Sequence, residues 1–303
     1  MKPTPILIRS FCKVNLALAV LGKRPDGYHE IRTVFQSIDL HDDLEIRPCA
    51  RLELRCRELD SVPVEQNTVW QAATALIRAA APATGAEIVL RKRIPAGAGL
   101  GGGSSNAAAA LLGLCRFWGL EVPAAELLTI AASIGSDVPF FLRGGTALGI
   151  GRGEEIYPLP EMQPAHLVVV YPGIHISTGA AYQSLSLMLT SRQATPNIQG
   201  FCGRLSEATG GLAEIFNDFE TTILPAYPAV KEAKDFLKER GATATLLSGS
   251  GSSVFGFFLD EESALAASRG GNARESWRVF PAKTLSRAEY FQSMFGSSPA
   301  NRN

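Results

Sequence analysis

The sequence predicts an α+β chain with two domains. Its length of 303 residues suits one large or two ordinary domains. Around residue 100 an apolar strand, a glycine-rich loop and an alanine-rich helix follow one another, and they lie within a first domain expected at residues 1–160. After it, apolar strands alternate with helical segments and predict a smaller βαβ-type domain at residues 161–295. We expect the Gly-, Ser- and Asn-containing tail at residues 296–303 to be disordered.

The composition is that of a soluble globular protein, with 46% apolar and 19% charged residues. The formal net charge is zero, so no basic excess points to nucleic acid or to an anionic membrane. No apolar run approaches the ~20 residues of a membrane span, and the first residues lack a signal-peptide core. We therefore expect a cytoplasmic protein whose partners include neither nucleic acid nor membrane.

The cysteines and histidines predict neither a disulfide framework nor a transition-metal site. The five cysteines are odd in number and form no Cys-x-x-Cys pair, and the four histidines are scattered. Reduced, buried thiols are the expectation for an intracellular chain.

A glycine-rich loop at residues 95–106 organises the chain. Five glycines fall within seven residues, and such density is entropically costly unless the backbone must approach something closely. Residues 87–90 predict a strand before the loop, and the alanines and leucines after it predict a helix that stops at Gly119. The N–H groups and dipole of a helix N-terminus suit a phosphate. A flexible linker is the alternative, which the tight joint to a strong helix disfavours.

Other glycine motifs fit the loop less well. Residues 97–102 match Gly-x-Gly-x-x-Gly formally, but the dinucleotide fingerprint needs a helix that begins within the glycines and an acidic residue after a second strand. Here we expect the helix to start after Ser104, and Glu121 and Glu126 follow a helix end. A P-loop needs a lysine after Gly103, and a protein kinase needs later His-Arg-Asp and Asp-Phe-Gly motifs. Neither is present.

The apolar strand predicted at residues 6–21 contains two polar side chains, Lys13 and Asn15. Strand alternation puts them on one face, about 7 Å apart. A buried, unpaired ammonium is costly, so Lys13 is a candidate cation for a phosphate or a reacting hydroxyl. An edge-strand lysine whose ammonium reaches solvent is the alternative.

A turn at residues 25–27, Pro-Asp-Gly, presents Tyr28 and His29. An aromatic ring beside an imidazole suits stacking and hydrogen bonding of a flat heterocycle, although a turn with a packed tyrosine explains the pattern as well. Strands are expected at residues 33–40, 43–47 and 52–55, and a helix at 67–80 with Asn67 or Thr68 as its cap.

A second helix is expected at residues 124–133, followed by Asp137 at the head of an apolar run. Asp137 is the one well-placed carboxylate for accepting a hydroxyl proton, and a helix N-cap is the alternative. Residues 144–153 predict a hairpin edge.

In the second half, residues 167–172 predict a buried strand and residues 190–210 a polar loop. A helix is expected at residues 229–240. A Gly-Ser turn lies between apolar strands at residues 246–255, and a further helix and a strand at 277–283 follow. Tyr182 is expected either to pack within a helix or to stack on a flat heterocycle in the binding site.

Residues Pro95 to Ala107 resemble the ATP loop of the GHMP small-molecule kinases, which include galactokinase, homoserine kinase and mevalonate kinase. The triple glycine before Ser-Ser-Asn, and the run from Lys13 to Gln36 with its Asp-Gly-Tyr-His element, narrow the resemblance to one branch of that superfamily. Members of this branch use ATP to phosphorylate a hydroxyl of a CDP-linked methylerythritol. The segments around Asp137, Tyr182 and Gly249 match the same branch.

The resemblance implies the two-domain GHMP kinase fold, with an N-terminal domain like domain 2 of ribosomal protein S5 and a ferredoxin-like C-terminal domain. It implies ATP and Mg²⁺ as cofactors and a small-molecule substrate that carries a CDP group. We expect a monomer or weak homodimer. Another GHMP kinase, of the homoserine or mevalonate type, is the near alternative. A dinucleotide-binding oxidoreductase and a non-catalytic nucleotide-binding module are the alternatives from different classes.

The resemblance also assigns roles to residues. Asp137 is the implied base, and Lys13 steadies it and offsets charge on the moving phosphoryl group. The implied substrate-binding residues are Asn15, Tyr28, His29, Thr178, Tyr182 and Gly249, with the two tyrosines expected to sandwich the cytosine and His29 to read its edge. The implied nucleotide-binding residues are Asn67, Lys92, Pro95, Ala96, Gly97, Ala98, Gly99, Leu100, Gly101, Gly102, Gly103, Ser104, Ser105 and Asn106. Either Ser104 or Ser105 is expected to offer a hydroxyl to Mg²⁺, which prefers oxygen ligands.

Overall fold

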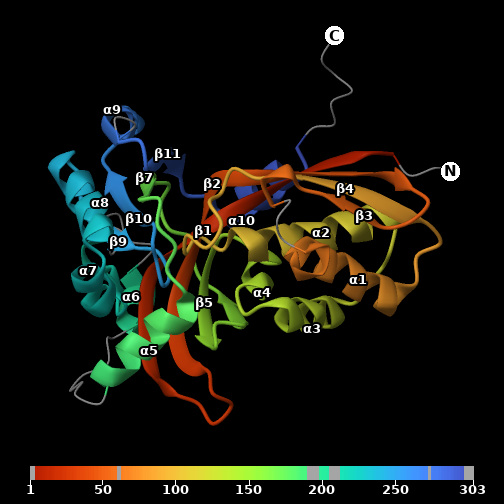
Figure 1. Cartoon of the computed structure of the whole chain (residues 1–303), viewed down its shortest axis with the longest axis horizontal. Helices are drawn as coiled ribbons and strands as arrows, with labels where there is room; N and C mark the ends of the chain where they lie inside the picture. Colours follow the sequence, from red (N-terminus) through yellow and green to blue (C-terminus); the bar gives the residue numbers. More distant parts are fainter. Residues whose placement is uncertain (1–3, 60–62, 190–197, 205–211, 272–273, 297–303) are drawn as a thin grey trace.

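The computed structural model describes residues 4–59, 63–189, 198–204, 212–271 and 274–296 (Figure 1). The tail expected to be disordered lies outside the described residues from 297 on, and so does most of the expected loop at 190–210. The described chain forms two β-sheets with helices packed against them, which confirms the predicted α+β class.

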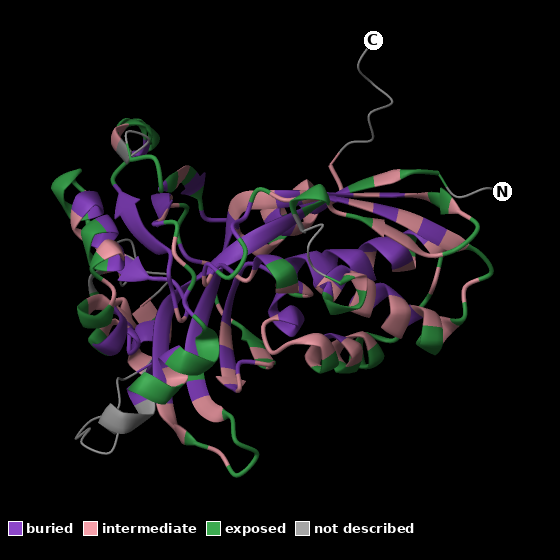
Figure 2. Cartoon of the chain, viewed as in Figure 1, coloured by how far each residue is buried: buried purple, intermediate pink, exposed green. Residues whose placement is uncertain are grey.

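The first sheet has seven strands among the described residues, in the order β3-β4-β2-β1-β8, with β5 paired to β2 and β6 at the outside of β5. Its strands are β1 (Ile6–Lys23), β2 (His29–Cys49), β3 (Glu53–Arg55), β4 (Gly85–Arg91), β5 (Thr146–Gly151), β6 (Glu155–Pro158) and β8 (Phe216–Asn217). The long antiparallel hairpin β1–β2 runs through the molecule to an exposed tip (Figure 2). Gly27 makes the tip turn possible because its φ is +87°.

Strand β2 is longer than the sequence indicates. The strands expected at residues 33–40 and 43–47 are one strand, because Asp42, at the expected break, is paired with Ser10 of β1. Asp42 is fully buried and its carboxylate accepts backbone N–H bonds from Arg93 and Ile94, at 2.6 and 2.8 Å. A polar residue that usually ends a strand is thus satisfied inside the sheet.

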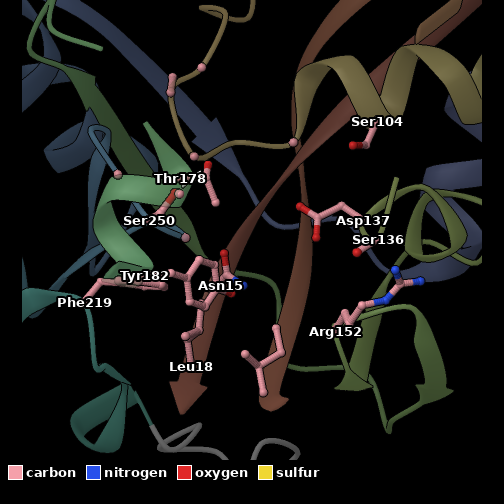
Figure 3. A pocket seen from close by; sticks show the side chains of 18 of the residues that line it. Asn15, Leu18, Ser104, Ser136, Asp137, Arg152, Thr178, Tyr182, Phe219 and Ser250 are labelled. Carbon is pink, nitrogen blue, oxygen red and sulfur yellow. Dashed lines mark hydrogen bonds between the residues drawn. The ribbon is translucent and has the colours of Figure 1, made fainter. Parts of the chain in front are cut away.

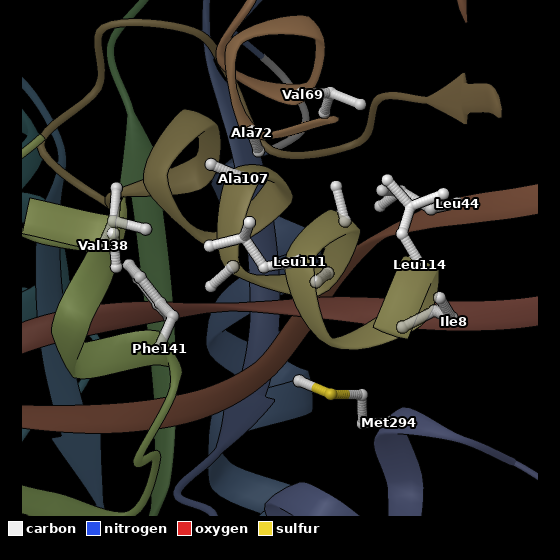
Figure 4. Packing of buried hydrophobic residues seen from close by; sticks show 14 of the residues in the cluster. Ile8, Leu44, Val69, Ala72, Ala107, Leu111, Leu114, Val138, Phe141 and Met294 are labelled. Atoms are coloured by element: carbon white, nitrogen blue, oxygen red, sulfur yellow. The ribbon is translucent and has the colours of Figure 1, made fainter. Parts of the chain in front are cut away.

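Helices α1 (Thr68–Ala80), α2 (Gly102–Trp118), α3 (Ala124–Ile134) and α4 (Val138–Phe141) contribute to the core of the first half (Figure 4). Asn67 caps α1, since its side chain accepts a 2.9 Å bond from Val69 N. The alanines of α2, residues 107–110, are fully buried. A Cβ on Gly113 would lie 2.0 Å from Ile8 Cδ1, so small residues let this helix lie directly against the sheet.

Helix α2 begins at Gly102, within the glycines, and the expected start after Ser104 is wrong. The first turn forms without helix-favouring side chains because Thr68 Oγ1 donates to Gly103 O at 2.7 Å and Ser105 N donates to Gly101 O at 2.8 Å. The contrast with the dinucleotide motif therefore depends on the element that comes after α2, which is helix α3 and not a second strand.

The second sheet has the order β11-β7-β10-β9, and every neighbouring pair is antiparallel. Its strands are β7 (His166–Tyr171), β9 (Ala244–Leu247), β10 (Val254–Phe258) and β11 (Arg278–Lys283). The helices of this half are α5 (Thr178–Leu189), α6 (Ile198–Arg204), α7 (Glu220–Ala226), α8 (Pro228–Glu239) and α9 (Glu261–Gly271). This order, with helices between β7 and β9 and between β10 and β11, is the ferredoxin-like arrangement.

Two segments of the second half join the first. Strand β8 pairs with β1 in parallel, and helix α10 (Arg287–Met294) buries Tyr290 and Met294 in the core of the first half. The domain boundary at residue 160 stays a prediction. The described part of the expected loop at 190–210 contains helix α6, which the sequence analysis did not predict.

Candidate active site

A cavity of about 940 Å³ lies where the two halves meet, and both contribute to its wall (Figure 3). The glycine loop and the start of α2 line one side. Strand β1, the β1–β2 turn, helix α5 and the Gly-Ser turn between β9 and β10 line the rest. Segments that the sequence singled out separately are thus brought together.

Close packing explains several glycines of the loop. Gly97, Gly99 and Gly101 have φ values of +63°, +78° and +67°. A Cβ on Gly97 would lie 2.3 Å from His175 Nδ1, and one on Gly99 would lie 2.1 Å from Ser248 O. These positions therefore need glycine because other parts of the protein pack closely against the loop. The glycine density alone had suggested close approach of a ligand instead.

Gly103 differs from those glycines. A Cβ at this position would meet Thr68 Oγ1 only at 3.5 Å, an ordinary contact. Gly101, Gly102, Gly103 and Ser104 all line the cavity. Within the described chain no side chain caps the N-terminus of α2, whose N-cap is Gly101. The first-turn N–H groups and the positive end of the helix dipole are therefore available to an anion in the cavity.

Lys13 is the buried cation of the cavity. Its residue is 3% exposed, and its Nζ donates to Asn15 Oδ1 at 2.7 Å and to Gly99 O at 3.0 Å. Asp137 Oδ2 lies 3.6 Å from the same nitrogen. The Asn15 amide is held in turn, because its Nδ2 donates to Thr33 Oγ1 at 2.7 Å. The ammonium is paired inside the protein and does not reach solvent as an edge-strand lysine would.

Asp137 stands at the N-cap position of α4, but among the described residues its side chain makes no capping hydrogen bond. Its carboxylate lies at the cavity, near Ser136 and Arg152 (Figure 3). With a side chain 32% exposed, it is accessible to a bound molecule while it contacts Lys13. This Lys–Asp pair can orient a hydroxyl and accept its proton.

Aromatic rings line the opposite part of the cavity. His29 and Tyr182 stack on each other, with ring centroids 4.8 Å apart and planes 19° apart. Phe219 packs edge-on against Tyr182 at 4.8 Å. Tyr28 is 54% exposed at the hairpin tip, with the Arg152 guanidinium 4.8 Å from its ring centroid. His29, not Tyr28, therefore contacts Tyr182 in the structure.

Burial acts on both rings of the stacked pair. It lowers the pKa of His29, and the charge of Lys23 lowers it further. Burial and the nearby negative charge of Asp137 raise the pKa of Tyr182 well above its usual range. Both rings are therefore neutral at pH 7.

The Gly-Ser turn after β9 lies against the Lys13 side of the cavity. Gly249 lines the cavity, and Thr178 Oγ1 lies 3.2 Å from Ser250 Oγ across the wall. Ser248 Oγ donates to Gly99 O at 2.9 Å, and Ser253 N donates to Ala98 O at 3.1 Å. The turn thereby fixes the glycine loop of the other half.

Some expected nucleotide contacts lie elsewhere in the described chain. The residues that do not line the cavity are Asn67, Lys92, Leu100, Ser105 and Asn106. Ser105, Asn106 and Lys92 belong to a buried polar network behind the loop, Leu100 is in the core, and Asn67 caps α1. Helix periodicity turns the side chains at 105 and 106 away from the cavity that Ser104 faces.

The buried network is centred on Asp42. Its Oδ2 accepts from Lys92 Nζ at 2.5 Å and from Asn106 Nδ2 at 2.9 Å. Ser105 Oγ donates to Phe11 O at 2.5 Å and accepts from Ser10 Oγ at 2.8 Å. The network ties the chain on both sides of the glycine loop to the hairpin β1–β2.

The cavity also contains residues that the sequence analysis missed, among them Lys23, Thr68, Ser136, Arg152, Phe219 and Ser250. Arg152 lies in the turn between β5 and β6, and an arginine between two glycines there was a usable signal. Phe219 carried no local signal, because only the tertiary structure brings it beside Tyr182.

No cluster of three or more His, Cys, Asp or Glu side chains suited to a metal ion occurs among the residues that the structure describes. The two serines expected to offer a hydroxyl to Mg²⁺, Ser104 and Ser105, differ in whether they reach the cavity. Ser104 lines the cavity, whereas the Ser105 hydroxyl is engaged with Ser10 and Phe11. In the described ranges, no helix combines the length and the apolar character that crossing a membrane requires.

Comparisons with known proteins agree with this geometry. The sequence profile of the GHMP kinases N terminal domain matches residues 67–145, and that of the GHMP kinases C terminal region matches residues 201–274. The 4-diphosphocytidyl-2-C-methyl-D-erythritol kinase of Solibacter usitatus (strain Ellin6076) is 44% identical over 86% of this chain and 83% of its own. The enzyme of that name from Geobacter sulfurreducens (strain ATCC 51573 / DSM 12127 / PCA) is 39% identical over 92% and 99%.

Solved structures give the same picture. A crystal structure of 4-(cytidine 5'-diphospho)-2C-methyl-D-erythritol kinase superposes with a TM-score of 0.79 at 32% identity, over 92% of this chain and 99% of that one. The mevalonate kinase of L. major in complex with R-mevalonate superposes with a TM-score of 0.67 at 14% identity, over 94% and 97%. The second likeness indicates a shared fold alone.

Proposed function

Because the chain belongs to the GHMP kinases and, within them, to the 4-diphosphocytidyl-2-C-methyl-D-erythritol kinase family, we propose that it transfers the γ-phosphoryl group of ATP to the 2-hydroxyl of 4-diphosphocytidyl-2-C-methyl-D-erythritol. The products are the 2-phosphate and ADP, and the reaction belongs to the non-mevalonate route to isoprenoid precursors. The chain is an ATP-dependent small-molecule kinase.

One observation carries the proposal at the level of the site. A single cavity contains a helix N-terminus without a side-chain cap, a pair formed by the buried Lys13 and the accessible Asp137, and a stacked aromatic pair. These suit, in turn, the phosphates of a nucleotide, the acceptor hydroxyl and a flat base. A phosphoryl transfer between two nucleotide-sized molecules needs all three within reach of one another.

In the proposed mechanism Asp137 accepts the proton of the acceptor hydroxyl as the oxygen attacks the γ-phosphorus. Lys13 keeps the carboxylate in place and offsets negative charge on the phosphoryl group in transit. The 3.6 Å separation of Lys13 Nζ and Asp137 Oδ2 supports this division of work. The hydrogen bonds from Lys13 Nζ to Asn15 Oδ1 and Gly99 O would hold the ammonium in the same place throughout the reaction.

The nucleotide is proposed to bind along the glycine loop, with its β-phosphate at the N-terminus of α2. Main-chain N–H groups and Ser104 would contact it directly. The proposed parts of Lys92, Ser105 and Asn106 are indirect, since their side chains lie in the buried network that holds the loop. Mg²⁺ would be held by the phosphates and the Ser104 hydroxyl, where it would neutralise phosphate charge.

The CDP group is proposed to bind with its cytosine on Tyr182, with Tyr28 on the other face and His29 at the edge. For that arrangement His29 must move off the Tyr182 ring, which it covers at 4.8 Å. Aromatic stacking contributes about 1–3 kcal/mol per base, so the cytidine serves as an anchor for the substrate. Asn15, Thr178 and Gly249 line the wall between the two ends.

A coupled assay of ADP release tests the function. We expect turnover with ATP and the CDP-methylerythritol compound in the presence of Mg²⁺, little without Mg²⁺, and competition by CDP or CMP. Turnover of homoserine or mevalonate, without competition by CDP, would favour the other GHMP kinases. Quenching or enhancement of NADH fluorescence on titration would favour a dinucleotide-binding oxidoreductase, and failure to form ADP would leave a nucleotide-binding module.

The remaining expectations are proposals of the same kind. We propose a cytoplasmic protein that is a monomer or weak homodimer, with its domain boundary near residue 160. Cell fractionation, sedimentation at several concentrations and limited proteolysis test these in turn.

A further inference from the structure

A short segment of the second half, residues 217–220, contacts three parts of the cavity that no sequence motif connects. It begins with the last residue of β8, Asn217, and ends with the first residue of α7, Glu220. Asn217 is 5% exposed and Phe219 is 1% exposed. Phe219 lies directly beside Tyr182 at the cavity (Figure 3).

The Asn217 amide holds the Gly-Ser turn after β9. Its Nδ2 donates to the carbonyl oxygens of Leu247 and Gly249, both at 2.8 Å. Its Oδ1 accepts from Phe219 N at 3.0 Å. Both N–H donors and the oxygen are thus in use, which fixes the side chain and the two sides of the turn.

The position of that turn matters because Gly249 lies against the reactive ammonium. A Cβ on Gly249 would lie 3.3 Å from Lys13 Nζ and 3.5 Å from Asn15 Oδ1. Any shift of the turn toward the cavity would displace Lys13, and any shift away would leave its pocket open on one side.

The same segment is attached to the strand that carries Lys13. Asp218 N donates to Leu18 O at 3.0 Å, and Val20 N donates to Asp218 Oδ2 at 2.8 Å. Strand β8 pairs with β1 at Ala17 and Leu18. The segment therefore sets the distance between β1 and the turn at Gly249.

Phe219 acts on the other end of the cavity. Its ring meets Tyr182 edge-on, at 4.8 Å and 84°. This aromatic contact restrains the Tyr182 ring, on which the cytosine is proposed to stack. Neighbouring residues of one segment thus support the chemical end and the base-binding end of the cavity separately.

We propose that Asn217 and Phe219 are positioning residues, Asn217 for Lys13 in phosphoryl transfer and Phe219 for Tyr182 in binding the CDP group. This inference rests on the proposed function. It assigns a loss of kcat to one residue and a rise in KM to a residue two positions away, whereas a general structural role of the segment would change both together.

The test is steady-state kinetics of the full chain with ATP and the CDP-methylerythritol compound. Asn217→Leu, similar in volume and without donors, is expected to lower kcat about 10-fold or more, with both KM values changed less than about 3-fold. Asn217→Ser, which keeps one donor, is expected to be intermediate. Phe219→Leu is expected to raise KM for the CDP compound about 10-fold with kcat within about 2-fold.

Thr284→Val is the matched control, because Thr284 is buried outside the cavity and the change removes its partly buried hydrogen bond from Ala165 N, at 2.9 Å. It is expected to lower the melting temperature without changing kcat. A wild-type kcat in Asn217→Leu and Asn217→Ser overturns the proposal, and so does an equal loss of kcat in Thr284→Val. If Asn217→Leu fails to fold, Asn217→Ser decides.

The two proposals fail in distinguishable ways. If the wild-type chain releases no ADP with the CDP compound, the proposed function fails, and calorimetry with CDP then tests the part of Phe219. Weaker CDP binding by Phe219→Leu supports that part, and unchanged binding overturns it.

Discussion

At the scale of single residues, the cavity depends on a lysine that the fold encloses. Lys13 is buried yet contacts three oxygen atoms, from Asn15, Gly99 and Asp137. A buried charge is tolerated when it is paired and hydrogen-bonded. Its partner Asp137 keeps access to the cavity, so the pair combines a fixed cation with an accessible carboxylate.

Asp137→Asn and Lys13→Ala are expected to lower kcat by about 100- to 10,000-fold, because each removes a group proposed to act in proton transfer or charge neutralisation. Stopped assays of ADP release measure the loss, and circular dichroism checks that the fold is kept. Asp235→Asn is the control, since it breaks a Lys–Asp pair exposed on α8 and should leave kcat unchanged. Near-normal turnover in either variant would remove that residue from the mechanism.

If His29 contacts the base edge as proposed, binding of the CDP compound is expected to depend on pH. Burial and Lys23 lower its pKa, so the ring gains a proton only below the usual value of about 6.5. The protonated ring lacks an acceptor nitrogen for the base edge. KM for the CDP compound should therefore be flat from pH 8 to 7 and rise several-fold toward pH 5.5.

His29→Asn is the non-titrating control for this dependence: its KM should be higher but flat with pH, and an equal rise in both proteins would contradict the assignment. The stability of the fold is expected to change with pH in the same direction, being lower at acidic pH. The folded state binds this proton less tightly than the unfolded state, so the contribution of His29 to the unfolding free energy falls as the pH falls through this window.

At the scale of elements, the join between the glycine loop and α2 contains glycines that the fold needs and one, Gly103, that the proposed nucleotide would need. Gly99 has a left-handed φ and no room for a Cβ, whereas Gly103 is helical with an ordinary contact at 3.5 Å. Glycine thus occurs in this loop for two reasons: close packing of the fold at Gly99, and proposed access for a phosphate at Gly103.

Gly99→Ala is expected to destabilise the chain by about 3 kcal/mol or more, because a Cβ would meet Ser248 O in a strained conformation. Gly103→Ala is expected to keep or raise stability by up to about 1 kcal/mol, through helix propensity. It should nevertheless raise KM for ATP, because the methyl group would stand where a phosphate approaches. Urea denaturation and ATP kinetics measure the two effects. Equal stability losses, or an unchanged KM in Gly103→Ala, would contradict this division.

At the scale of the whole molecule, the two halves are joined through the cavity wall itself. Ser248 and Ser253 hold the glycine loop from the other half, β8 extends the first sheet, and α10 returns to the first core. The site is complete only when both halves are folded and in contact.

We therefore expect one cooperative unfolding transition. In a variant with Trp70→Phe and Trp118→Phe, the fluorescence of Trp277 reports on the second half, where this ring is buried. The denaturation midpoint from Trp277 fluorescence should coincide with the midpoint from circular dichroism. The Trp277→Phe variant, in which Trp70 and Trp118 report on the first half, should give the same midpoint. Separate midpoints would show that the halves unfold independently.

The sequence alone determined the features that short stretches of backbone decide. The turn at residues 25–27, the cap at Asn67, the glycine loop before a helix and the hairpin at 246–255 depend on neighbours in the chain, and the structure contains each of them. The family resemblance rests on the same local strings. The expectation that these segments meet in one site followed from that resemblance, and neither composition nor periodicity predicted it.

Only the tertiary structure decided which side chains face the cavity. Asn106 and Lys92 donate to Asp42 behind the loop, and Ser105 donates to Phe11 O. Helix α2 begins earlier than expected, and Asn217 holds a turn some 30 residues away. Such choices depend on which buried donors and acceptors find partners from distant segments. A sequence read in order does not contain these pairings, because packing decides them when the sheets and helices come together.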